Sequence, residues 1–168
     1  MTTYTLTPHE TVTVLTETPE AIEVEAVYAP EGSPPPAHLH PAQDERFKVL
    51  AGTLTVRLGS SERVLAEGEV LEIPRNTPHQ MWNAAGEPAR VAWRTSPAGR
   101  TRDWWATLDR LQREGRVGRD GMPGPLAFAV YLTEFRDVFR LHAGVLTPVV
   151  AGALRALAPV GRLRGYRS

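Results

Sequence analysis

The sequence has no cysteine, no net charge and no internal repeat, and each absence narrows the possible classes of protein. Without cysteine the chain forms no disulfide, no cysteine-ligated iron–sulfur cluster and no thiolate metal site. Its 19 basic and 19 acidic residues cancel, so we expect no nucleic-acid partner. The first residues, MTTYTLTPHE, lack the basic-then-apolar layout of a secretory signal, and the cytoplasm is the expected location.

A membrane-spanning segment is not expected either. The stretch 142–161 is apolar, but Arg155 lies within it. Pro148 and Pro159 bracket only about ten residues, whereas a spanning helix needs about twenty. We expect instead a short helix over 149–158 that packs on the β region or on a second subunit.

The distribution of charge divides the chain near residue 99. Residues 1–99 carry 7 basic and 13 acidic side chains, whereas residues 100–168 carry 12 basic and 6 acidic ones. A chain of 168 residues fits one domain, or one domain with a sizeable appendage. We therefore predict a folded domain over 1–99 and an extension over 100–168.

Apolar residues of the first region recur at every second position. Short runs of Gly, Pro, Asn or Ser interrupt this alternation, which is typical of an antiparallel β-sandwich or barrel. The alternating segments are 11–16, 21–29, 49–58, 63–74 and 89–95. Gly52 and Gly68 lie where hairpin turns need a residue free of the Cβ restriction.

The second region has helical periodicity. An amphipathic pattern begins at Thr101, a plausible cap, and ends at Gly115. After a glycine-rich loop, further helices are predicted over 126–141 and 149–158. Their apolar faces indicate a homodimer, and we expect Trp104 and Trp105 to be packing anchors against the barrel.

A compact group of metal-ligand residues occurs in the stretch HLHPAQDE, residues 38–45. On a β-strand, residues i and i+2 project from the same face, so His38 and His40 point into one small volume. Pro41 ends that strand, and Glu45 begins the next one. Three candidate ligands therefore come from two adjoining strands.

A fourth candidate, His79, follows the turn in GEVLEIPRNTPHQMWN, at the head of another strand. Three neutral imidazoles and one carboxylate suit one divalent first-row metal: iron, manganese, nickel, cobalt, copper or zinc. His9 and His142 stand apart from both segments, and we expect them at the surface or at a helix end.

These residues resemble the two motifs of the cupin superfamily. The first motif, G-x5-H-x-H-x(3,4)-E-x6-G, is matched by Gly32, His38, His40, Glu45 and Gly52. The second, G-x5-P-x-G-x2-H-x3-N, is matched by Gly68, Pro74, His79 and Asn83, with Asn76 in a glycine position. Asparagine tolerates positive φ well, so we expect the turn to be kept.

The resemblance, which covers about residues 20–95, is to a single-domain metal-binding cupin of the cupin 2 type with a C-terminal helical extension. It implies a mainly β fold, the double-stranded β-helix or jelly-roll barrel. It also implies that His38, His40, Glu45 and His79 hold the metal at the mouth of the barrel.

The side chains that share the ligands' face predict the wall of a substrate pocket. By alternation, Phe47 and Val49 follow Glu45, and Met81 and Asn83 follow His79. This mostly apolar wall suits a small organic substrate, aromatic compounds included, that the metal orients. No other side chain near the motifs is an evident nucleophile or general base, so any chemistry depends on the metal.

Glu45 is the candidate catalytic residue, because a carboxylate that loosens from the metal can accept a substrate proton. Cupins that resemble this arrangement include quercetinase-like dioxygenases, isomerases and decarboxylases. We expect a metal-dependent, dioxygenase-type oxidoreductase. Two alternatives stay open: a non-enzymatic module that binds metal and a small molecule, and a metal-assisted isomerase or lyase.

Overall fold

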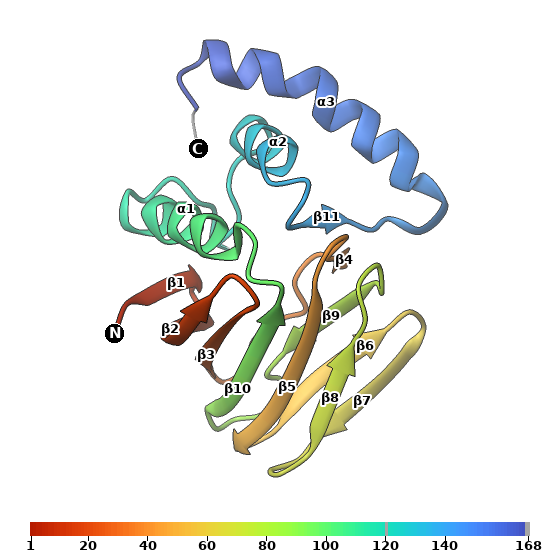
Figure 1. The fold of residues 1–168 in the computed structure, drawn as a ribbon. Helices are drawn as coiled ribbons and strands as arrows, with labels where there is room; N and C mark the ends of the chain where they lie inside the picture. Colours follow the sequence, from red (N-terminus) through yellow and green to blue (C-terminus); the bar gives the residue numbers. More distant parts are fainter. Residues whose placement is uncertain (120, 167–168) are drawn as a thin grey trace.

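Two antiparallel sheets face each other and form a barrel, and helices cover one end of it (Figure 1). The computed structural model describes residues 1–119 and 121–166. One sheet has the order β1-β2-β3-β10-β5-β8, with bounds Thr3–Thr7, Glu10–Thr18, Ala21–Tyr28, Ala89–Ser96, Asp44–Ala51 and Val70–Ile73. The other has the order β11-β4-β9-β6-β7, with bounds Arg140–Leu141, His38–Leu39, His79–Trp82, Leu54–Leu58 and Ser61–Leu65.

The core of the barrel follows from the alternation in the sequence. On β3, Ile22, Val24 and Ala26 are each at most 1% exposed, whereas Glu23 between them is exposed. Burial of one apolar face per strand is what stabilises two facing sheets. The prediction of a mainly β jelly-roll barrel with a C-terminal helical extension is confirmed.

β1 lies outside the predicted strands. It pairs with β2 and also meets α1 (Thr101–Arg113), where the amide of Thr5 donates a hydrogen bond to Oδ1 of Asp109 at 3.0 Å. Its alternation is short, with only Tyr4 and Leu6 buried, so the period-two signal is weak. The strand therefore links the N-terminus of the chain to the first helix.

The second predicted helix is too long, because α2 covers only Pro125–Glu134. Beyond it the chain turns at Phe135 and continues as β11, which pairs with β4. The apolar side chains Phe135, Val138 and Phe139 gave this segment a helical pattern, yet its backbone joins a sheet. The apolar pattern indicates which side chains are buried. It does not indicate whether the backbone forms hydrogen bonds within a helix or with a neighbouring strand.

The last helix is longer than predicted. A short 3₁₀ turn, η1 (Gly144–Leu146), leads into α3 (Thr147–Leu163), which continues through Pro159. By length and composition alone, the stretch Gly144–Leu163 is long and apolar enough to cross a membrane, contrary to the ten-residue segment expected from the prolines. Only 11% of its most apolar window is buried, and the helix packs on α2.

Gly161 sets how closely α3 approaches α2. A Cβ atom at this position would lie 2.6 Å from Cγ2 of Val130 and 2.7 Å from the carbonyl oxygen of Leu126. By contrast, a Cβ atom at Gly152, in the same helix, would meet nothing within 4 Å. The two glycines therefore form a matched pair, one in close contact and one in open space.

We predict that Gly161→Ala loosens the packing of α3, at a cost of about 1–3 kcal/mol, because backbone of α2 must move to make room. Gly152→Ala should be neutral or stabilise by up to about 1 kcal/mol, since alanine favours a helix. Chemical unfolding and hydrogen exchange of α3 amides would measure both. Equal behaviour of the two variants would contradict the close contact.

Candidate metal centre

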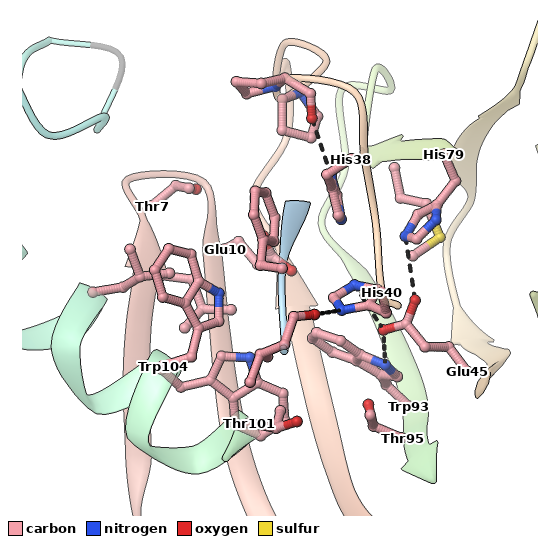
Figure 2. Close-up of a pocket in the computed structure, with 18 of the residues that line it drawn as sticks. Thr7, Glu10, His38, His40, Glu45, His79, Trp93, Thr95, Thr101 and Trp104 are labelled. Atoms are coloured by element: carbon pink, nitrogen blue, oxygen red, sulfur yellow. Dashed lines mark hydrogen bonds and ion pairs between the residues drawn. The ribbon is translucent and has the colours of Figure 1, made fainter. Parts of the chain in front are cut away.

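The imidazoles of His38, His40 and His79 meet between the two sheets (Figure 2). His38 begins β4 and lies directly opposite His79, the first residue of β9. One ring nitrogen of each of the three histidines lies within 4.8 Å of the corresponding atoms of the other two. The structure thus brings together three of the four predicted ligands within reach of a single ion.

Glu45, the fourth predicted ligand, reaches this cluster from β5 in the opposite sheet. Its Oε1 lies 3.4 Å from Nε2 of His40, and its Oε2 lies 3.2 Å from Nε2 of His79. The indole nitrogen of Trp93 donates a hydrogen bond to Oε1 at 3.1 Å. Because Glu45 is only 3% exposed, its carboxylate is fixed against the imidazoles.

Backbone carbonyl groups orient all three imidazoles in the same way. The Nδ1 atoms of His38, His40 and His79 lie 3.0, 2.7 and 2.9 Å from the carbonyl oxygens of Pro36, Val138 and Thr77. A carbonyl oxygen only accepts, so each Nδ1 carries the proton and donates it. The lone pair of a neutral ring is then on Nε2, the atom that faces the cluster.

Burial and neighbouring charge set the protonation of these groups. Burial lowers the pKa of His38 well below its ordinary value, and burial also lowers the pKa of His40. For His79, burial is outweighed by the hydrogen bond and charge of Glu45, and the pKa is raised. Burial likewise would raise the pKa of Glu45, but His40 and His79 outweigh it and lower that pKa.

The site therefore holds a carboxylate, two imidazoles that favour the neutral form, and one that favours a positive charge. Oε2 of Glu45 is buried and has no well-directed hydrogen bond among the described residues. A divalent cation would supply the positive charge that His79 otherwise takes up as a proton. On this chemistry, the four side chains fit a first-row divalent metal.

The turn before His79 has the shape that the second motif requires. Asn76, which replaces the usual glycine, has φ = 63°, and its amide donates to the carbonyl of His40 at 2.9 Å. Asparagine tolerates this left-handed conformation because its short side chain bonds locally. The turn therefore connects the two ligand-bearing segments through the backbone.

The C-terminal extension completes the site. β11 pairs with β4 at Leu39 and His38, and the carbonyl of Val138, just before β11, accepts the hydrogen bond of His40. The ring of Phe139 stacks on that of His38, with centroids 4.4 Å apart and planes inclined by 17°. The extension thus supplies both a backbone acceptor and one wall of the metal centre.

A cavity of about 110 Å³ lies beside the four candidate ligands. Phe47 and Met81, two of the predicted substrate contacts, line it. Val49 is instead fully buried in the core, and the amide of Asn83 is bound to the carbonyls of Tyr28 and Glu87 outside this cavity.

Several side chains outside the motifs also line the cavity. Trp104 and Trp105 are 5% and 2% exposed, so they are packed as predicted, but they also form part of the wall. The hydroxyl of Thr95 is buried there without a hydrogen-bond partner among the described residues. Neither His9 nor His142 belongs to the histidine cluster.

Glu10 and Tyr28 are the titratable wall residues that the sequence reasoning missed. Glu10 lies far from the motifs along the chain, and Tyr28 lies just before the first motif but outside it, so motif spacing does not reach either residue. Strand alternation contained a signal, because Glu10 shares the face of β2 that carries the fully buried Val12. Extending that alternation by one step towards the N-terminus would have placed Glu10 inside.

Comparison with known proteins agrees with this architecture. Residues 24–94 match the family model of the cupin domain. Among solved structures, KdgF from Halomonas sp. superposes with a TM-score of 0.54 at 20% identity, covering 61% of this chain and 93% of that one. At this identity the similarity shows the fold alone.

Two curated relatives share stretches of sequence. The tetracenomycin polyketide synthase protein TcmJ of Streptomyces glaucescens is 33% identical over 90 residues, covering 54% of each chain. An oxidoreductase of Arthrobotrys oligospora is 41% identical over 58 residues, covering 33% of this chain and 22% of the relative. The chain thus spans about half, or less, of the relatives it matches. With the cupin-domain match over residues 24–94, the double-stranded β-helix and both motifs in place, the chain contains a cupin domain.

Proposed function

We propose that the protein is a metal-dependent cupin oxidoreductase of the dioxygenase type, acting on a small organic substrate. The observation that carries the proposal is the common orientation of the three imidazoles, each fixed through Nδ1 by a carbonyl. Nε2 of His40 and of His79 lies beside the carboxylate of Glu45. Such outer hydrogen bonds are typical of built metal sites. His38, His40, Glu45 and His79 would hold the ion.

A bound divalent metal would polarise a substrate oxygen or bring dioxygen beside the substrate. The residues of the chain then exclude water and orient the ligand. Phe47, Met81, Trp104 and Phe139 make an apolar wall around the ligand space. The carboxylate of Glu45, kept in place by Trp93, can accept a substrate proton when it is released from the ion.

The size of the cavity bears on the substrate. At about 110 Å³ it is smaller than the roughly 150 Å³ engineered cavity known to bind benzene. A compound with one ring, or a short enolisable dicarbonyl, therefore fits better than a three-ring flavonol of the quercetinase type. Similarity to an oxidoreductase of Arthrobotrys oligospora supports the reaction class.

We predict that purified protein binds one divalent transition metal per chain and that His79→Ala loses it, with affinity reduced at least about tenfold. The control is His142→Ala, which removes a histidine outside the cluster. Elemental analysis after reloading with iron, manganese, nickel, cobalt, copper or zinc would measure the stoichiometry. Failure of the unchanged protein to take up any of these metals would refute the proposed site.

We also predict oxygen consumption by metal-loaded protein with a catechol or a β-diketone, and less with a flavonol. Oxygen uptake should disappear in His79→Ala while circular dichroism shows an intact fold. Product formation without oxygen uptake would favour the isomerase or lyase. Tight ligand binding with no turnover would favour the non-enzymatic module.

We infer in addition a homodimer formed through η1 and α3. The exposed side chains Val145, Val149 and Leu163, which are 95%, 68% and 89% exposed, give this end of the molecule an apolar surface. Self-association would remove that surface from water. Light scattering should report twice the mass of the chain, and a monomer at high concentration would contradict the inference.

A further inference from the structure

Among the residues that the structure describes, two titratable side chains besides the candidate ligands line the cavity, Glu10 and Tyr28. They come from the β2–β3 hairpin, outside both motifs. Glu10 begins β2 and stands directly opposite Tyr28, the last residue of β3. The Tyr28 hydroxyl donates a hydrogen bond to the Glu10 carboxylate.

The hairpin fixes this pair firmly. The next inward pair along the same two strands is Val12 and Ala26, and both are fully buried. A shift of register by one residue would turn these apolar side chains outward, so the pairing is strongly specified. The carboxylate of Glu10 is therefore held at the cavity by the core of the barrel.

Glu10 and Tyr28 also line a second, larger cavity of about 600 Å³, next to the first. Exposed residues, among them His9, Pro34 and Arg119, form part of its wall, so it extends to the surface. A proton on Glu10 thus has a route to water that bypasses the metal ligands. Figure 2 shows Glu10 among the side chains around the inner cavity.

We propose that Glu10 is a catalytic residue of this cavity and accepts a proton from a hydroxyl or enol group of the bound substrate, with Tyr28 as its positioning residue. This role rests on the proposed function above, and it narrows the substrate to a phenol, a catechol or an enolisable dicarbonyl compound. These compounds combine an apolar body with a weakly acidic O–H group, which matches an apolar wall with one carboxylate that is not a candidate metal ligand.

The proton transfer is balanced within the site. The O–H bond of the substrate breaks, its electron pair stays on the substrate oxygen, and a new O–H bond forms on Glu10. The proton then returns to the product or leaves through the outer cavity. In this assignment Glu10 takes the proton in place of Glu45, so Glu45 can keep its place among the imidazoles.

The electrostatic environment agrees with this role. Burial raises the pKa of Glu10 to about 7, with the Tyr28 hydrogen bond acting against it and the charge of Glu45 adding to it. Burial also raises the pKa of Tyr28 well above its ordinary value, so Tyr28 stays a donor. In the described part of the chain, the other titratable or charged groups facing the two cavities are His9, His38, His40, Glu45, His79 and Arg119.

The test uses 4-nitrocatechol, whose visible spectrum distinguishes its protonated and ionised forms, with zinc-loaded protein. Zinc has no redox chemistry, so the probe is bound but not consumed. We expect the bound probe to ionise at a pH lower than in water. In Glu10→Gln this ionisation should move down by about one pH unit, at unchanged zinc content, because the negative charge that opposes ionisation beside the probe hydroxyl is removed.

Tyr28→Phe should give a smaller shift in the same direction, because the carboxylate remains but loses its fixed position. The control is Glu20→Gln, in the exposed turn between β2 and β3. If Glu10→Gln does not fold, Glu10→Asp serves as the second variant. It keeps the charge but moves it away from the probe by one methylene group, so the shift in the pH of probe ionisation should still appear.

Three outcomes would overturn the role of Glu10. If the bound probe ionises at the same pH in Glu10→Gln as in the unchanged protein, at normal zinc content, Glu10 does not have this role. The proposed metal site is not affected by that result. Zinc-loaded protein that does not bind the probe contradicts the substrate class. Unchanged protein that takes up no zinc refutes the proposed function itself, and the zinc analysis distinguishes this failure from the other two.

Discussion

The hydrogen bonds from three imidazole Nδ1 atoms to backbone carbonyls are the interactions on which the site depends. Each bond fixes both the tautomer and the direction of one ring, so that Nε2 faces a common point. Without them, Nδ1 and Nε2 would compete as ligands, and the rings could rotate. Two of the carbonyls lie two residues before the histidine they orient, at Pro36 and Thr77, so most of this arrangement is local.

That local character explains why the grouping of the three histidines could be predicted from the sequence. Spacing on a strand decides which face His38 and His40 share, and the turn at Asn76 decides where His79 begins its strand. The third acceptor, Val138, lies 98 residues from His40. No spacing rule connects them, and the helical pattern over 126–141 concealed the strand that brings them together.

The same distinction applies to the wall of the cavity. Phe47 and Met81 follow ligands by alternation and reach the cavity, but Val49 and Asn83, one further step along, do not. The strands twist and leave the mouth of the barrel, so alternation predicts the face of a side chain and not its height in the barrel. Glu10 shows the opposite case. It lies far from the motifs in sequence, yet the register of the β2–β3 hairpin brings it to the mouth of the barrel.

The extension shapes the cavity together with the barrel. Trp104 packs against Phe135 and Phe139, with ring centroids 5.5 and 5.2 Å away, and so ties α1 to the segment that carries Val138. The ion pair between Arg100 and Asp137 adds to this link, but it is about half-exposed, and such pairs contribute little. Aromatic packing therefore holds the third carbonyl in place. Since Phe139 also covers His38, a change in this packing would alter ligand orientation and cavity shape together.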